Sequence, residues 1–106
     1  MIITIQGKQG EGKTTLAKKI CKEKKVSLIQ EHSLKSPFWT NPIDNDTDFI
    51  LIDDVTNYEQ TYSILKGETL TVNKPGKEPF GMKMPDVILV REVSREKLRQ
   101  LKPIIL

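Results

Sequence analysis

The sequence is short of cysteine, histidine, long apolar runs and excess charge of either sign. A single cysteine, Cys21, excludes an internal disulfide and is typical of a protein in a reducing compartment. His32 is the one histidine and has no cysteine at ligand spacing, so a metal site built on it is not expected. No stretch approaches the roughly 20 apolar residues that span a membrane, and the apolar start of the chain leads into glycines and lysines instead of a cleavage site. We therefore expect a cytoplasmic protein with no membrane partner.

Chain length and net charge bear on the number of domains and on the type of binding partner. The 106 residues predict one domain, spanning 1–106, that can bury a core of its own. The net charge of +3 is a mild basic bias, which is compatible with nucleic-acid binding but too small to require it.

The stretch from Gly7 to Thr14 carries the strongest chemical signal. It reads Gly-Lys-Gln-Gly-Glu-Gly-Lys-Thr and matches the phosphate-loop pattern G-x-x-x-x-G-K-[ST]. A β-branched segment at 1–6 precedes it and a segment with helical spacing at 14–24 follows, which is the strand–loop–helix context that the motif requires. Glycines let backbone N–H groups approach phosphate oxygens, and the helix N-terminus adds a partial positive charge. The residues predicted to bind the phosphates of a nucleoside triphosphate are Gly7, Lys8, Gln9, Gly10, Glu11, Gly12, Lys13, Thr14 and Thr15.

Two acidic residues after an apolar run form the second signal. The run at 49–52 is typical of a strand buried on both faces, and Asp53 and Asp54 follow at the end where open α/β sheets bind ligands. This is the form of a Walker B motif. We expect Asp53 and the Thr14 hydroxyl to hold Mg²⁺. The predicted catalytic residues are Asp54, which would orient an attacking water, and Lys13, which would stabilise charge on the phosphates. An ordinary strand that ends in an Asp-Asp turn is the competing interpretation.

The remaining patterns predict an α/β fold with a mainly parallel sheet, flanking helices and an inserted β-hairpin. Further elements are expected as strands at 26–29 and 86–90, a helix at 56–67, a last helix from Ser94 and a final strand at 103–106. Residues 30–47 are rich in turn-forming residues and are expected to form a loop. Within it, Phe38 and Trp39 are expected to anchor on the core, with stacking on a base as the less favoured alternative.

The hairpin is expected from two segments that alternate with period two, at 69–73 and 80–84. The Pro-Gly pair between them is a turn signal, so Lys74 and Lys77 should lie near the tip.

Other phosphate-loop classes fit less well. A GTPase would carry an aspartate-x-x-glycine after the acidic strand, but the chain continues from Asp53 as Asp-Val-Thr. A small-molecule kinase would need an acceptor pocket and a lid, and no insertion is long enough for a lid. No residue pattern identifies the base.

The chain most resembles the ATPase core of superfamily 3 helicases, the AAA-related branch found in viral and plasmid replication proteins. The resemblance rests on the loop at 7–14, the paired acids after 49–52, the hairpin at 69–84 and the strand at 86–90. It implies a three-layer phosphate-loop fold in minimal form, with ATP and Mg²⁺ as the bound nucleotide and cofactor. It also implies single-stranded nucleic acid as a partner through Lys74 and Lys77, a homo-oligomer, and a location in the host cell if the source is viral.

One departure from this family bears on activity. The family's sensor strand ends in an asparagine that reads the γ-phosphate, whereas Arg91 and Glu92 follow Val90 here. Proteins of this kind also need an arginine finger from a neighbouring subunit, and the residues that could serve are Arg91, Arg95 and Arg99. Three functions stay open: a nucleic-acid-associated ATPase, a nucleotide-dependent binding module with little turnover, and a small-molecule phosphotransferase.

Overall fold

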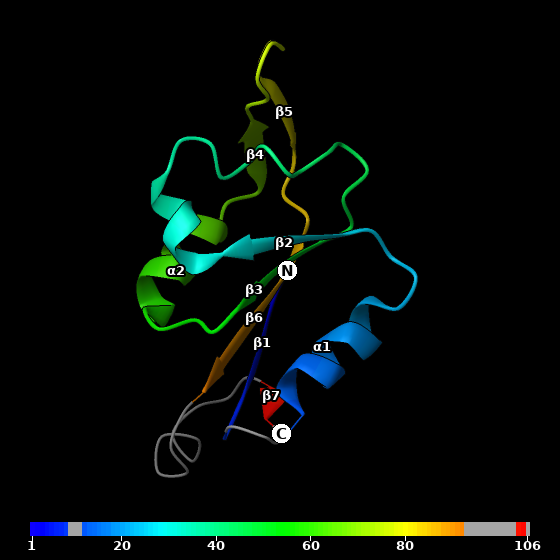
Figure 1. Ribbon diagram of the computed structural model, residues 1–106, viewed down its shortest axis with the longest axis vertical. Helices are drawn as coiled ribbons and strands as arrows, with labels where there is room; N and C mark the ends of the chain where they lie inside the picture. The colour runs from blue at the N-terminus through cyan, green and yellow to red at the C-terminus, as the bar shows by residue number, and fades with distance from the viewer. Residues whose placement is uncertain (9–11, 93–103, 106) are drawn as a thin grey trace.

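The computed structural model describes residues 1–8, 12–92 and 104–105, in which a five-stranded sheet has helices on both faces and a two-stranded sheet stands apart (Figure 1). In chain order the elements are β1 (Ile2–Gly7), α1 (Lys13–Cys21), β2 (Val26–Gln30), the 3-10 helix η1 (Glu31–Lys35), β3 (Phe49–Asp53), α2 (Tyr58–Leu65), β4 (Thr69–Val72), β5 (Phe80–Lys83), β6 (Asp86–Glu92) and β7 (Ile104–Ile105). The sheet has the order β2-β3-β6-β1-β7, and each neighbouring pair is parallel. The expected α/β class is confirmed.

Strand β6 lies between β1 and β3, although it follows both of them in the sequence. Ile88 is the register partner of Ile3 on one side and of Leu51 on the other. The run from Val87 to Val90 is buried, as expected for a parallel strand covered on both faces. Because the three strands are parallel, their carboxyl ends meet at the same edge of the sheet.

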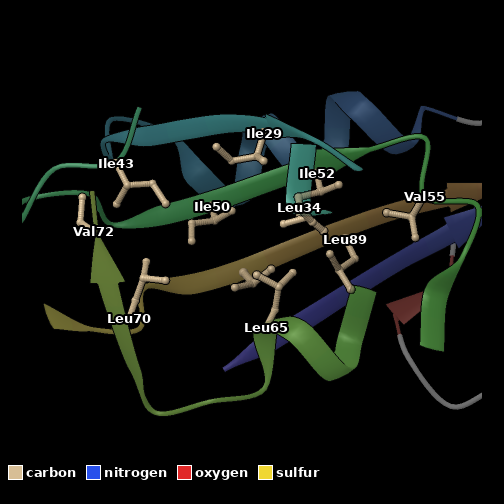
Figure 2. Packing of buried hydrophobic residues seen from close by; sticks show 11 residues of the cluster. Ile29, Leu34, Ile43, Ile50, Ile52, Val55, Leu65, Leu70, Val72 and Leu89 are labelled. Atoms are coloured by element: carbon tan, nitrogen blue, oxygen red, sulfur yellow. The ribbon is translucent and has the colours of Figure 1, made fainter. Parts of the chain in front are cut away.

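Alternation along the strands divides the core into two clusters. On one face, Leu51 and Ile88 pack with Ala17 and Cys21 of α1. Cys21 is buried and is therefore a core residue, and burial raises the pKa of its thiol. The larger cluster on the other face, most of it labelled in Figure 2, consists of Ile29, Leu34, Ile43, Ile50, Ile52, Val55, Leu65, Leu70, Val72, Val87 and Leu89.

The hairpin expected at 69–84 is present as a separate antiparallel sheet of β4 and β5. Leu70 and Val72 lie on one face of β4 and are buried in the larger cluster, so this strand is packed against the core. At the turn, Gly76 adopts a φ of 72° and the Lys77 N–H donates to the Lys74 carbonyl at 3.1 Å. The hairpin precedes the amino-terminal end of β6 and points away from the sheet's carboxyl edge (Figure 1).

Both helices are shorter than the sequence pattern predicted. The helix expected at 14–24 ends at Cys21, because Lys22 takes a φ of 42°, which lies outside the helical region. The helix expected at 56–67 begins after Asn57, whose side chain accepts a hydrogen bond from the Gln60 N–H at 3.3 Å. The asparagine therefore acts as the N-cap instead of a helical residue.

The stretch expected to be a loop at 30–47 contains the 3-10 helix η1. Trp39 packs against the larger cluster as predicted. Phe38 is 64% exposed, so the prediction that it anchors the loop is wrong. Strand β6 continues to Glu92 instead of ending at residue 90, because β1 pairs with it as far as Gly7.

At the carboxyl end, the helix expected from Ser94 lies outside the described residues. Strand β7 falls within the strand expected at 103–106 and pairs with β1 through Ile5 and Ile104. In the described ranges, no helix has the length and apolarity needed to cross a membrane.

Deleting the same side chain at a buried and at an exposed position tests the packing of the central strand. Leu89 of β6 is fully buried, whereas Leu28 of β2 is 66% exposed. Because Leu89→Ala leaves a cavity, it should lower the free energy of unfolding by about 2–5 kcal/mol. Leu28→Ala should change that energy by about 0.5 kcal/mol or less. Urea unfolding followed by circular dichroism checks both values, and equal losses would contradict this description of the core.

Candidate functional site

The carboxyl edge of the sheet brings the predicted loop and the predicted acids together. Gly7 ends β1, Asp53 ends β3, and Arg91 and Glu92 end β6 between them. Register pairs Gly7 with Glu92, so the phosphate loop starts level with the end of the central strand. Segments that are distant in the sequence are thus one strand apart in space.

The described part of the phosphate loop has the backbone that its glycine pattern predicts. Gly12 precedes α1 with a φ of 81°, a left-handed value that side chains other than glycine adopt at a cost. Thr14 and Thr15 are exposed in the first turn of α1, where backbone N–H groups lack helical acceptors. Lys8 is also exposed. The remaining predicted loop residues, Gln9, Gly10 and Glu11, lie outside the described residues.

Lys13 is turned toward its own loop. Its ammonium donates a hydrogen bond to the Lys8 carbonyl oxygen at 2.5 Å, across the segment that connects β1 to α1. The side chain is half-buried. An anion in the loop would offer this ammonium a charged acceptor in place of a neutral carbonyl, which is the stronger interaction.

Thr14 and Asp53 approach each other directly, from α1 and from the end of β3. The Thr14 hydroxyl donates to Asp53 Oδ2 at 3.3 Å. A hydroxyl and a carboxylate so placed are the oxygen ligands that Mg²⁺ prefers, and Mg²⁺ commonly takes its other ligands from water and phosphate. The residues therefore fit a site with few protein ligands. Among the described residues, no group of three or more His, Cys, Asp or Glu side chains could hold a metal by itself.

Asp54 occupies a constrained turn. Its φ is 53°, a left-handed value that aspartate and asparagine tolerate better than most residues. Its N–H donates to Asp53 Oδ1 at 2.8 Å, and the next N–H, of Val55, donates to the Val90 carbonyl of β6 at 2.9 Å. The Asp54 side chain itself is exposed at the carboxyl edge.

Glu31 is a site residue that sequence reasoning missed. Its carboxylate accepts hydrogen bonds from the Thr56 N–H and hydroxyl, the Asn57 N–H and the Thr61 hydroxyl. Burial raises the pKa of Glu31, but these hydrogen bonds outweigh it and hold the pKa below its ordinary value. The available signal was an acidic residue two positions after the strand expected at 26–29, at the same edge as Asp53.

Arg91 is held on the α2 side of the sheet. Its guanidinium carbon lies 4.6 Å from the centroid of the Tyr58 ring, a cation–π contact. The Tyr58 hydroxyl in turn lies 2.9 Å from the Thr4 hydroxyl of β1. Of the three candidate arginine fingers, Arg95 and Arg99 lie outside the described residues.

The two hairpin lysines have different surroundings. The Lys74 ammonium forms an ion pair with Asp44, which also pairs with Lys25 at 3.0 Å. The backbone next to it is anchored as well, since the Asn73 N–H donates to Thr40 Oγ1 at 3.0 Å. Lys77 is exposed in the turn. Neither lysine lies at the carboxyl edge with the loop and the acids (Figure 1).

Comparison with known families gives one match over most of the chain. A family model described as RNA helicase matches residues 3–95, a span that includes the loop, the paired acids and the hairpin. A comparison with curated proteins gives no match.

Two solved structures share the fold. An apo structure of the NrS-1 C-terminal region, in its A form, is 24% identical over 87% of this chain, with a TM-score of 0.65. A second apo A-form structure of that region is 26% identical over 89% of this chain, with a TM-score of 0.58. This chain covers 24% and 23% of those two chains, so it spans about a quarter of their length.

The ion pairs of Asp44 predict a pH-dependent contribution to stability. Hydrogen bonds from Lys74 and Lys25 lower the pKa of the Asp44 carboxyl from 3.8 to about 2. Because the folded-state pKa is depressed, the stabilisation is present above pH 3.8 and is lost as pH falls through about 2. Asp44→Asn should therefore be less stable than wild type at pH 7 and 5, by a difference that shrinks between pH 4 and 2.

Urea unfolding at a series of pH values measures that difference. Glu78→Gln, which removes a carboxylate from the exposed hairpin turn, is the control and should follow wild type. A wild-type advantage over Asp44→Asn that does not change with pH would contradict the ion-pair account.

Proposed function

Because this chain belongs to the RNA helicase family of superfamily 3 helicases, we propose that it is an ATPase domain that binds ATP with Mg²⁺ and acts with nucleic acid. The observation that carries the proposal is the contact between Thr14 and Asp53, which joins the two predicted motifs at one edge of the sheet. We take residues 1–106 as a single phosphate-loop domain, with the site made from β1, α1, β3 and β6.

Binding of the triphosphate is assigned to the loop at 7–15. Backbone N–H groups of the loop and the first turn of α1 would surround the phosphates, which the partial positive charge of the helix end favours. Lys13 would leave the Lys8 carbonyl and bind the β- and γ-phosphates instead. The charged acceptor compensates for the hydrogen bond that is lost.

Thr14 and Asp53 would hold Mg²⁺ through their side-chain oxygens. The bound cation would neutralise negative charge that develops on the phosphates. Asp54 is the group best placed to orient the attacking water, because it follows Asp53 directly and its carboxylate is exposed at the same edge. Its backbone is tied to Asp53 and, through Val55, to β6, so the carboxylate is presented from a constrained turn.

A second candidate function is a nucleotide-dependent binding module with little turnover. Arg91 stands where the family's sensor strand has an asparagine, and its guanidinium is engaged with the Tyr58 ring. This arrangement supports binding without an efficient reading of the γ-phosphate. Measuring ATP affinity and phosphate release separately distinguishes an ATPase from a binding module. Family membership favours either of these functions over a small-molecule phosphotransferase.

Single-stranded nucleic acid is the proposed partner of the hairpin, with Lys77 as the principal contact. Lys74 is the weaker candidate, because a phosphate would have to displace Asp44 from its ammonium. We also propose a homo-oligomer in which an arginine of one subunit, chosen from Arg91, Arg95 and Arg99, completes the site of its neighbour.

Replacing one carboxylate tests the hydrolytic role of Asp54. Asp54→Asn keeps a side chain that tolerates a φ of 53°, so the turn should persist. Phosphate release should fall by about 10²–10⁴-fold if the carboxylate orients water, with little change in ATP affinity. Glu59→Gln, which neutralises an exposed carboxylate on α2, is the control and should hydrolyse ATP like wild type. An unchanged rate in Asp54→Asn removes this residue from the mechanism.

Charge reversal at the hairpin tests the proposed nucleic-acid contact. Lys77→Glu should weaken binding to an oligothymidylate and make the dependence of log affinity on log salt less steep by about one unit, because one phosphate contact is lost. Lys24→Glu, at an exposed lysine after α1, makes the same change of charge away from the hairpin. Equal weakening in the two variants would show a general charge effect and would contradict the proposal that the hairpin contacts nucleic acid.

A further inference from the structure

The four residues that connect β3 to α2 have all their backbone N–H groups hydrogen-bonded, to three different parts of the chain. The first N–H, of Asp54, donates to Asp53 Oδ1 at 2.8 Å, and the second, of Val55, donates to the Val90 carbonyl at 2.9 Å. The third and fourth, of Thr56 and Asn57, donate to Glu31 Oε2 at 2.8 and 3.1 Å. The turn is therefore anchored at three points: Asp53 at the end of β3, Val90 of β6, and Glu31, which follows β2.

Glu31 can reach this turn because of the parallel register of β2 and β3. Gln30 is the register partner of Asp53, so Glu31 begins level with Asp54 at the carboxyl edge. Its side chain extends over the turn to the start of α2. Besides the two backbone groups, it accepts from the Thr56 hydroxyl at 2.5 Å and from the Thr61 hydroxyl at 3.2 Å.

These contacts are strong for their type. A carboxylate that accepts backbone N–H groups at a helix N-terminus gains from charge-assisted hydrogen bonds and from the helix dipole. Glu31 is half-buried and Thr61 is 2% exposed, so part of the network is screened from water. Four donors occupy the carboxylate, which leaves it a structural role at this edge instead of one in proton transfer.

We propose that Glu31 is a positioning residue, which fixes the turn after β3 and so sets where the Asp54 carboxylate stands relative to the phosphate loop. The role of Asp54 in this statement rests on the proposed function. Asp54 needs such support because its left-handed backbone is not the conformation that an unconstrained aspartate prefers. Displacement of a reacting group by about 1 Å can cost about 10²-fold in rate.

Two substitutions of Glu31 separate its hydrogen bonds from its charge. In Glu31→Gln the amide oxygen can still accept from the Thr56 and Asn57 N–H groups, and the amide N–H₂ can donate to the Thr56 hydroxyl. Glu31→Ala removes all four bonds. Glu59→Gln, on the exposed face of α2, is the matched control.

The measurements are steady-state ATP hydrolysis and amide hydrogen exchange at residues 56 and 57. In Glu31→Ala we expect kcat to fall by about 10²-fold with KM nearly unchanged, together with faster exchange at both amides. In Glu31→Gln most of the activity and the slow exchange should return. If Glu31→Ala does not fold, Thr56→Val, which removes one hydroxyl donor, is expected to give a smaller loss of kcat in the same direction.

Two results would overturn the proposal. One is unchanged exchange at residues 56 and 57 in Glu31→Ala, because the turn would then not depend on Glu31. The other is a normal kcat in Glu31→Ala with faster exchange, because the turn would then not position a catalytic group. Absence of ATP hydrolysis by wild type would instead refute the proposed ATPase function, and the exchange data would still decide whether Glu31 holds the turn.

Discussion

The parallel register of β1, β6 and β3 is the constraint on which the candidate site depends. The loop after β1 and the acids after β3 lie on opposite sides of β6, and the contact between Thr14 and Asp53 depends on how these three strands are aligned. A slip of one residue would move a strand end by about 3.3 Å and turn its side chains to the other face. The buried run from Val87 to Val90 prevents this, because its side chains belong to one core cluster or the other.

Apolar packing sets the strands, but polar contacts set the turn that carries Asp54. The Val90 carbonyl and the Glu31 carboxylate hold three consecutive N–H groups after Asp54. This places three carboxylates, those of Glu31, Asp53 and Asp54, at the end of neighbouring strands. Four donors within the chain occupy the Glu31 carboxylate, whereas the Asp54 carboxylate is exposed.

Strand β6 links the two chemically distinct ends of the molecule. The β4–β5 hairpin leads into its amino-terminal end, and Arg91 stands at its carboxyl end between the loop and the acids (Figure 1). At the hairpin, the ion pair of Lys74 with Asp44 ties the turn to the segment after η1 and lowers the pKa of Asp44 to about 2. Lys77 remains exposed in the hairpin turn.

Local spacing in the sequence was enough to predict the strand and the helix on either side of the loop at 7–14, the acidic strand end at Asp53, the hairpin and the mainly parallel sheet. These features are encoded within short segments, through glycine positions, alternation and apolar runs. The strand order, the partners of Lys74 and the hydrogen bonds of Glu31 were decided by the tertiary structure alone. Glu31 and Thr56 are 25 residues apart and Lys74 and Asp44 are 30 apart, so no local pattern pairs them. They meet only because burial of the apolar strand faces brings β2 beside β3 and packs β4 against the core.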